Sequence, residues 1–266
     1  MSTPRITAIV VVHGSPASTV DACINSLHSS VDVDVHIVLV DNASPDGGKA
    51  CARWRDDDRV TSVRSGRNGG FAAGVNLGLT HRRDADLVFL LNDDATVATD
   101  ALRNCADALA RTAGIVAIAP RIMLANEPDL IDSIGVVIRP NGEAFNAHIG
   151  ELWNGQVEDG SDVLGPCFCA ALFRADAFDA DNVGPIDERY HLYYEDIDWA
   201  LRAQRAGLRC VAATAATVLH QHAASTRKLG EPARYELVQR NLLLCVTKNF
   251  TARAAVAAWA SRLVTQ

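Results

Sequence analysis

The sequence Asp86-Leu-Val-Phe-Leu-Leu-Asn-Asp-Asp-Ala95 joins an apolar run directly to a polar cluster. A continuous apolar run of this kind is typical of a strand that is buried on both faces of a parallel sheet. The run ends in Asn92, Asp93 and Asp94, and ligands of open α/β sheets bind just outside the carboxyl ends of the strands. Two carboxylates at that point suit a hard divalent cation, which prefers oxygen ligands and often shares them with a phosphate. A strand end followed by an aspartate helix cap is the alternative, and this stretch alone does not separate the two.

The rest of the amino-terminal half alternates between strand and helix patterns. Strands are expected near residues 6–12, 36–40, 60–63, 87–91 and 115–119. Helices are expected near 18–27 and 100–111, and another follows Gly70 and carries the small residues Ala72, Ala73, Gly74 and Gly78. Ser18 and Thr19 are expected to cap the first of these helices. This β-α-β-α order predicts a Rossmann-like, mostly parallel central sheet with helices on both faces.

The pattern changes after Pro120. Residues 129–150 are typical of a β-hairpin, with Asn141-Gly142 as the turn, and 163–173 and 208–219 are expected strands. Helices are expected within 185–206, closed by Gly207, and at 231–250 and 253–264. We interpret residues 1–266 as one domain, with a nucleotide-binding half at about 1–120, an acceptor and catalytic half at about 121–250, and an amphipathic helix at 251–266.

The composition of the chain limits the classes of function that it can have. The chain has 266 residues, of which 48% are hydrophobic and 21% charged, so it can bury a full core. The net charge of −7 argues against a nucleic-acid partner, because no basic face would neutralise phosphates. Cys167 and Cys169 lack the two-residue gap of zinc and redox motifs, so we interpret the seven cysteines as reduced core thiols. With no evident secretory signal or membrane span, we expect a cytoplasmic protein that can work at the inner face of the cell membrane.

Three polar clusters follow predicted strands of the first half, at residues 13–15, 41–44 and 92–94. Strand ends on one edge of a sheet converge on one crevice, where a carboxylate such as Asp41 could accept from a base or a ribose hydroxyl. Residues 66–70 add a glycine turn before a helix, where backbone N–H groups can approach a phosphate. The first strand is followed by one glycine, Gly14, instead of the dinucleotide fingerprint, so a nicotinamide enzyme is disfavoured.

The densest acidic cluster is Tyr193-Tyr-Glu-Asp-Ile-Asp-Trp199. Acids in the first turn of a helix complement its dipole, but that does not account for the aromatic residues beside them. Aromatic surface next to carboxylates fits a carbohydrate site, in which one carboxylate acts as general base on an acceptor alcohol. His220 and His222 end a later strand and share one of its faces, so they are candidate metal ligands.

These motifs together resemble the family-2 inverting glycosyltransferases with the GT-A fold, and especially their rhamnosyltransferase and galactofuranosyltransferase-like members. The resemblance covers nearly the whole chain and rests on an ordered set of motifs. They are Val40-Asp-Asn-Ala-Ser44, Asn68-Gly-Gly-Phe-Ala-Ala-Gly-Val-Asn76, Leu91-Asn-Asp-Asp94, Val183-Gly-Pro-Ile-Asp-Glu188, Tyr194-Glu-Asp-Ile-Asp-Trp199, His220 and Arg240-Asn241.

The resemblance implies a role for each matching residue. Asp196 would be the catalytic base, Asp94 and His220 would bind Mn²⁺ or Mg²⁺, and Tyr194, Glu195 and Trp199 would bind the acceptor. The nucleoside diphosphate sugar would be held by Val12, His13, Gly14, Asp41, Asn68, Gly70, Asn76, Asn92 and Asp93. The acceptor would be a hydroxyl of a glycan, a glycolipid or a small molecule, and peripheral membrane contact and a homodimer are compatible with the resemblance.

The chain departs from the family at two of these positions. Asn92 stands where the family has the first acid of its Asp-x-Asp motif. His13-Gly14 stands where many members have an Asn or Thr together with an aromatic residue. The resemblance favours dTDP-rhamnose as donor, with UDP and GDP sugars still open. Two alternatives are a sugar-1-phosphate nucleotidyltransferase and a non-catalytic nucleotide-sugar-binding domain. The first would need a basic loop after the first strand, and the second need not retain Asp94, Asp196 and His220 together.

The acceptor pocket is expected to be shaped by residues 129–160. Candidate aromatic contacts are Phe145, Trp153, Tyr190 and Tyr193, with core packing as the alternative for each of them.

Overall fold

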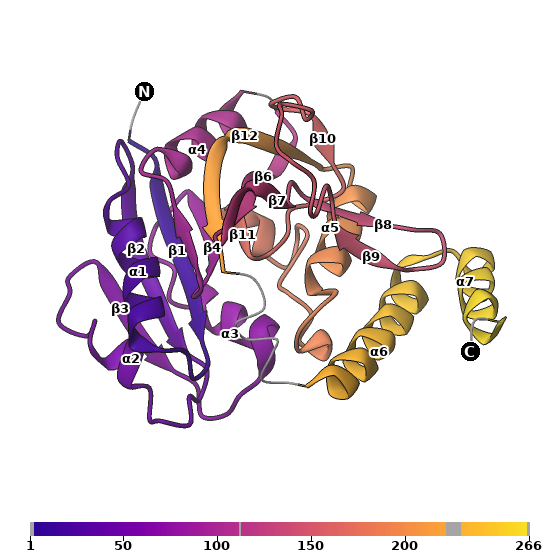
Figure 1. Cartoon of the computed structure of the whole chain (residues 1–266), viewed down its shortest axis with the longest axis horizontal. Coiled ribbons are helices and arrows are strands. Elements are labelled where there is room, and N and C mark those ends of the chain that lie inside the picture. Colours follow the sequence, from indigo (N-terminus) through magenta and orange to yellow (C-terminus); the bar gives the residue numbers. More distant parts are fainter. Residues whose placement is uncertain (1–2, 112, 222–229, 265–266) are drawn as a thin grey trace.

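The computed structural model describes residues 3–111, 113–221 and 230–264, which are built around one ten-stranded sheet (Figure 1). Its strands are Arg5–Val12 (β1), Asp34–Asp41 (β2), Val60–Arg64 (β3), Leu87–Asn92 (β4), Ala95–Val97 (β5), Ile115–Leu124 (β6), Glu127–Ser133 (β7), Asp162–Val163 (β10), Ala170–Arg174 (β11) and Arg209–His220 (β12). The strand order is β10-β12-β6-β11-β4-β1-β2-β3, while β5 pairs with β12 and β7 pairs with β6.

Helices cover both faces of this sheet (Figure 1). They are Ala17–His28 (α1), Lys49–Ala52 (α2), Gly70–Leu79 (α3), Ala101–Ala110 (α4), Glu195–Arg205 (α5), Glu231–Asn249 (α6) and Ala252–Val264 (α7), with 3₁₀ turns at Ala175–Phe178 and Glu188–Tyr190. Side chains of α1, α2 and α4 pack on one face, and those of α3 and α5 pack on the other. The mostly parallel sheet between two helical layers confirms the fold class predicted from the sequence.

The apolar run of β1 shows why these strands lie in the centre. Ile6, Ala8 and Val10 face α1, whereas Ile9 and Val11 face α3, so both faces of the strand are covered. Close packing of α3 depends on its small residues. A Cβ atom on Gly74 would lie 2.5 Å from Val11, and one on Gly78 would lie 2.6 Å from Ile9.

Two sequence predictions were wrong in detail. Neither Ser18 nor Thr19 caps α1, because the helix begins after Pro16, whose carbonyl accepts from the Thr19 and Val20 N–H groups. The expected strand 163–173 is two strands, β10 and β11, because the Gly165-Pro166 dipeptide interrupts it and proline has no N–H to donate.

The predicted hairpin is present within a narrower range. Val136–Ile138 (β8) and Ala144–Asn146 (β9) pair antiparallel across the Asn141-Gly142 turn, which confirms that turn, while β7 joins the main sheet. Gly142 has φ +85°, and a Cβ atom there would lie 2.4 Å from Val246 of α6. The turn is therefore packed on α6.

Gly207 ends α5 as predicted. It has φ +75°, its N–H donates to Gln204, and the next N–H donates to Ala203, which is a Schellman ending. α7 lies at the far end of the molecule beyond α6 (Figure 1). Within the described ranges, no helix combines the length and apolar character that crossing a lipid bilayer requires.

Candidate active site

Asn42 joins the polar ends of the first strands to the glycine turn before α3. Its Nδ2 donates to Asn68 Oδ1 at 3.1 Å and to the Gly70 carbonyl at 2.9 Å, while its Oδ1 accepts from the Gly69 N–H. The backbone carbonyl of Asn42 lies 2.9 Å from His13 Nδ1. The ends of β1 and β2 and the start of α3 therefore form one edge. Asn42 lies inside a motif quoted above, but no role was predicted for it.

Asp41 ends β2 as a buried carboxylate with a cationic partner. Its Oδ1 accepts from the Ser44 N–H at 2.8 Å, and its Oδ2 forms an ion pair with Arg64. The Gly14 N–H donates to Ser44 Oγ at 3.0 Å, which ties the first strand to the same turn. Arg64 remains partly exposed at the end of β3, so it is a cation at this edge that was not predicted from the sequence.

The start of α3 is fastened to the loop that precedes α5. Gly70 has φ +84°, and a Cβ atom there would lie 2.2 Å from the carbonyl oxygen of His191, which accepts from the Phe71 N–H. Further along the helix, Asn76 donates to the Ile186 carbonyl and to Glu188, and accepts from the Ile186 N–H. These contacts make Asn76 a brace between α3 and that loop.

The end of β4 meets the end of β12 through the short strand β5. β5 pairs antiparallel with β12 so that Ala95 lies opposite His220, and the Gln221 N–H donates to the Asp94 carbonyl at 3.0 Å. The side chains also meet, with Asp94 Oδ1 3.2 Å from His220 Nε2. Residues that lie far apart in the sequence are thus neighbours, as expected for candidate ligands of one ion.

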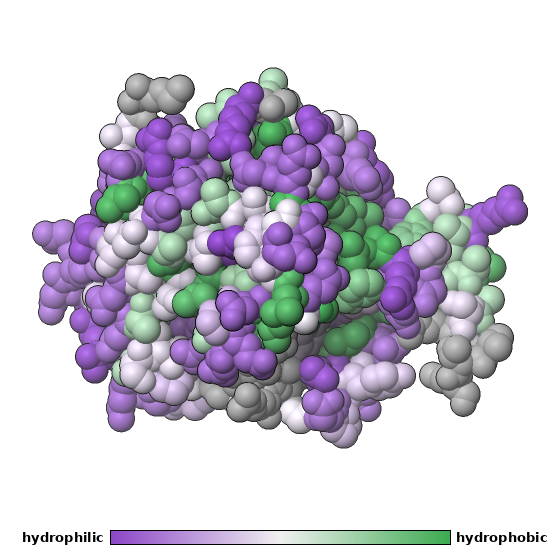
Figure 2. All heavy atoms as spheres, turned by 45° about the horizontal axis from the view of Figure 1, so that its top comes forward, coloured by the Kyte–Doolittle hydropathy of each residue, from purple (hydrophilic) through white to green (hydrophobic). Residues whose placement is uncertain are grey.

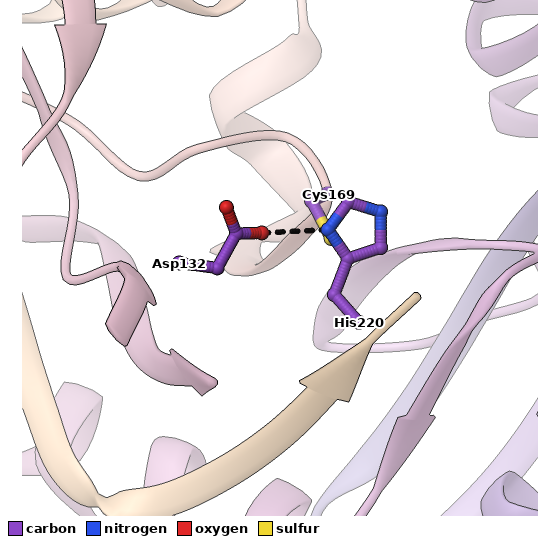
Figure 3. Close-up of side chains that lie close together, drawn as sticks. All are labelled: Asp132, Cys169 and His220. Atoms are coloured by element: carbon purple, nitrogen blue, oxygen red, sulfur yellow. Dashed lines mark hydrogen bonds and ion pairs between the residues drawn. The ribbon is translucent and has the colours of Figure 1, made fainter. Parts of the chain in front are cut away.

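The other ring nitrogen of His220 lies against a second carboxylate. His220 Nδ1 is 2.6 Å from Oδ2 of Asp132, which is fully buried on β7 (Figure 3). Burial lowers the pKa of His220, but its contacts with Cys169, Asp132 and Asp94 outweigh burial and raise that pKa well above its ordinary value. Asp132 and Cys169 were not predicted as site residues, and neither belongs to a recognisable motif.

The Asp94–His220 pair fits a divalent cation. Two ligand atoms at right angles, each about 2.1 Å from one ion, lie about 3 Å apart, close to the separation seen here. Asp132 accepts at the far side of the imidazole, which is the usual way to orient a metal-binding histidine. An imidazole together with a carboxylate favours Mn²⁺ over Mg²⁺, because Mg²⁺ strongly prefers oxygen ligands.

Two acids begin α5. Asp196 Oδ1 accepts from the Ile197 N–H at 2.8 Å, and Glu195 is buried beside it, with no hydrogen-bond partner for its Oε2 among the residues that the structure describes. Burial raises the pKa of Asp196 to about 6. Burial, followed by the charge of Asp196, raises the pKa of Glu195 well above its ordinary value. A partly exposed carboxylate with such a pKa suits a general base.

One cavity of about 310 Å³ unites these groups. Its lining includes the predicted residues Asn92, Asp94, Tyr194, Glu195, Asp196 and His220, together with Asp132, Cys169, Phe71, Phe145 and Tyr193. His13, Gly14, Asp41 and Asn68 lie outside this lining, at the edge formed by Asn42. Asp93 is buried beside Asp94, and the Val12 side chain is buried in the core, which leaves Val12 only its backbone for ligand contact.

The prediction that Trp199 binds the acceptor was wrong. Its side chain is 0% exposed and packs among Phe168, Phe173 and Phe178, with Nε1 donating to the Gly184 carbonyl. A tryptophan inside the core cannot stack on an acceptor sugar. Tyr194, by contrast, lines the cavity, and its hydroxyl donates to the Gly142 carbonyl and accepts from the Ala144 N–H.

A side chain of α6 holds the loop before α5 in place. Asn241 is fully buried, and its Nδ2 donates at 2.8 Å to each of the Tyr190, Leu192 and Tyr193 carbonyls. Asp198, also fully buried, accepts from Tyr190, Arg202, Lys248 and Asn249. Asp198, the last acid of the motif, is therefore an anchor for α6 and not a reacting group. His222, the other candidate histidine ligand, lies outside the described residues.

Comparisons with known proteins show the family of the chain. The model of the family described as Glycosyl transferase family 2 matches residues 7–180, which is more than half of the chain. The N-acetylglucosaminyl-diphospho-decaprenol L-rhamnosyltransferase of Mycobacterium tuberculosis is 26% identical over 250 residues, covering 85% of this chain and 79% of the relative. The low-salt glycan biosynthesis hexosyltransferase Agl10 of Haloferax volcanii is 22% identical, covering 86% and 72%.

Solved structures share the fold. The mannosyltransferase PcManGT of Pyrobaculum calidifontis, solved with GDP-Man and Mn²⁺, has a TM-score of 0.58 at 18% identity, covering 99% of this chain and 76% of that one. GalNAc-T7, solved with UDP, GalNAc and Mn²⁺, has a TM-score of 0.69 at 14% identity. That match covers 82% of this chain, which spans less than half (44%) of the GalNAc-T7 chain.

Proposed function

The chain belongs to glycosyl transferase family 2 and takes its sugar from a nucleotide sugar, and on that premise we propose that it moves rhamnose from dTDP-rhamnose with inversion. The choice of rhamnose is supported by the mycobacterial relative, which is named a rhamnosyltransferase. The acceptor in this proposal is a hydroxyl group of a glycan, a glycolipid or a small molecule.

The donor would lie along the edge formed by β1, β2 and the start of α3. His13, Gly14, Asp41 and Asn68 would face the nucleoside, with Arg64 as an additional cation beside Asp41. Asn92 and Asp93 would lie between the nucleoside and the cavity. Asn76 is left out of the donor site in this proposal, because its amide is already engaged with the 186–188 segment.

Asp94 and His220 would hold a divalent cation, Mn²⁺ by preference, with Asp132 orienting the imidazole. The cation would supply neutralisation of charge on the departing diphosphate. The mannosyltransferase PcManGT and GalNAc-T7 were both solved with Mn²⁺, which supports this choice of metal.

Asp196 would accept the proton of the acceptor hydroxyl. The acceptor oxygen forms its bond to the anomeric carbon on the face opposite the diphosphate, the bond from that carbon to the diphosphate oxygen breaks, and the configuration inverts. The largely desolvated position of Asp196 favours the reaction, because a carboxylate with a raised pKa is a stronger base than one in water. Glu195 and Tyr194 would contact the acceptor from the same wall of the cavity.

The acceptor side is the more apolar part of the surface. Phe145 and Ile149 near the hairpin, and Val256 and Trp259 on α7, are exposed, and Figure 2 shows hydrophobic surface gathered towards the side that carries α7. Such a surface suits an acceptor with a lipid or aglycone portion. Peripheral membrane contact and a homodimer stay predictions for the protein.

The observation that carries the proposal is that Asp94, His220 and Asp196 line the same cavity. A thermal-shift panel tests it with dTDP, UDP and GDP and their sugars, with and without Mn²⁺. A ligand that binds only the native state raises the midpoint, so we expect the largest rise for dTDP-rhamnose with Mn²⁺. An equal rise without Mn²⁺ would contradict the metal role, and a larger rise with UDP or GDP sugars would contradict the donor.

A further inference from the structure

Three potential metal ligands of different chemistry lie together behind the Asp94–His220 pair. Asp132, Cys169 and His220 come from β7, the turn before β11 and the end of β12, and one donor atom from each lies within 4.8 Å of the others. Figure 3 shows the sulfur and the Asp132 carboxylate beside Nδ1 of the ring, whereas Nε2 points away from both. All three residues are buried, and all three line the cavity, so a small cation can reach them.

We propose that Asp132, Cys169 and His220 Nδ1 form a second, inner cation site that prefers Zn²⁺ or another borderline-soft metal over Mn²⁺. A thiolate, an imidazole and a carboxylate are the donor types that zinc takes, whereas Mn²⁺ and Mg²⁺ favour oxygen. Ligand atoms on one tetrahedral zinc lie about 3.3–3.8 Å apart, given bonds of about 2.0–2.3 Å. The 2.6 Å between Nδ1 and Asp132 Oδ2 would therefore widen on zinc binding, while all three ligand atoms already lie within 4.8 Å of one another. The fourth position would face the cavity.

We call the Asp94–His220 pair, which uses Nε2 of the ring, the outer site. Because His220 belongs to both sites, a cation at the inner site prevents binding of a cation at the outer site. A neutral imidazole carries one lone pair for a metal and one N–H. A cation held between Asp94 and Nε2 takes the lone pair of Nε2, so the one ring proton is then on Nδ1, where it donates to Asp132. When zinc occupies Nδ1, the ring proton moves through solvent to Nε2, which then donates to Asp94 and cannot bind a cation. The Cys169 thiol proton leaves to solvent as the sulfur binds zinc.

This tautomer exchange predicts inhibition by zinc, a consequence that rests on the proposed function. Zinc at the inner site withdraws His220 from the outer cation, so excess Mn²⁺ should restore activity only at concentrations that also displace zinc from Nδ1. If zinc inhibited only by replacing Mn²⁺ at Asp94, substitution of Cys169 would not change the inhibition.

Direct metal binding to the purified protein tests the inner site without any need for turnover. Co²⁺ is the probe, because a cysteine thiolate bound to Co²⁺ gives a charge-transfer band in the near ultraviolet. We expect this band in the wild type, in Asp94→Asn and in the control Cys105→Ser, which alters a buried thiol on α4. We expect its loss in both Cys169→Ser and Cys169→Ala. Addition of Zn²⁺ should bleach the band.

The outcomes separate the two proposals. Absence of the band from the wild type, or its retention in Cys169→Ser and Cys169→Ala at an unchanged melting temperature, would overturn the inner site. In the activity arm, the zinc concentration for half inhibition should rise about tenfold to a hundredfold in Cys169→Ser, each variant being compared with its own zinc-free rate. A cobalt band in a protein that transfers no sugar would support the inner site while refuting the proposed function.

Discussion

Asp196 is the residue on which the proposed chemistry depends most directly. Asp196→Asn keeps the size and backbone contact of the side chain but removes its basicity. We expect turnover to fall about 10²- to 10⁴-fold. Affinity for the nucleoside diphosphate should stay within about twofold, because the proposed nucleoside site at the ends of β1 and β2 does not include Asp196. Asp176→Asn, at an exposed position of a 3₁₀ turn, is the matched control. Calorimetric binding and initial rates measure the two effects, and turnover close to the wild-type value would exclude Asp196 as base.

The raised pKa of Asp196 sets the pH dependence of the rate. Burial raises this pKa to about 6, and the base works only when it is ionised. At saturating Mn²⁺, kcat should therefore rise as the pH increases through about 6 and reach a plateau above it. An ordinary aspartate would give its rise near pH 4. A profile that is flat between pH 5 and 7 would show that ionisation of Asp196 does not control the rate.

Asp132 should matter for the outer cation although it does not face Asp94. Asp132→Ala removes the acceptor that holds Nδ1–H, so the imidazole loses its orientation and some basicity. The Mn²⁺ concentration for half-maximal nucleotide binding should rise about 10- to 100-fold. Asp129→Ala changes an exposed residue on the same strand and should leave that concentration unchanged. Equal behaviour of the two variants would remove Asp132 from the metal site.

These residues differ in how well the sequence reveals them. Asp94 and His220 can be predicted, because each ends an apolar strand and lies in a motif. Asp132 lies 88 residues from His220 in a segment with no motif, and Cys169 resembles any core thiol. Their part in the site depends on strand pairing at the end of β6, which local sequence does not encode. The prediction that Trp199 contacts the acceptor was wrong, because its neighbours in the sequence are polar although its ring is buried in the core.

At the scale of elements, α6 holds the loop that leads to the catalytic helix. Asn241→Ala removes the donor to three carbonyl groups of that loop. Leaving buried carbonyls without a donor should lower the free energy of unfolding by about 2–4 kcal/mol, and turnover should fall as the start of α5 shifts. Urea unfolding and initial rates measure both. Glu236→Ala, exposed on the same helix, is the control, and equal stability of the two variants would contradict the anchoring role.

Element type was easier to predict than element direction. The apolar runs of β1, β2 and β4 and the helices between them follow from periodicity and from short connections. The five residues of β11 carry no sign that they run antiparallel between β4 and β6. A short apolar run has no sequence signal for direction, so this placement follows from the path of the whole chain.

At the scale of the molecule, β11 and β12 bind the two halves of the sequence into one sheet. β11 lies between β4 and β6, and β12 pairs with both β5 and β6. A seam near residue 120 therefore crosses hydrogen-bonded strands and is not a boundary between independently stable parts. We infer that residues 1–120 and 121–266 unfold together.

Two probes of urea unfolding test this cooperativity. Trp54 is the only tryptophan among residues 1–120, so in Trp54→Phe the fluorescence reports the carboxyl half, while far-ultraviolet circular dichroism reports the whole chain. The two signals should share one midpoint, as they do for a single cooperative unit. Wild-type fluorescence, which includes Trp54, should give coincident transitions as the control. A carboxyl half that loses its fluorescence signal before the circular dichroism changes would mean that the shared sheet does not couple the halves.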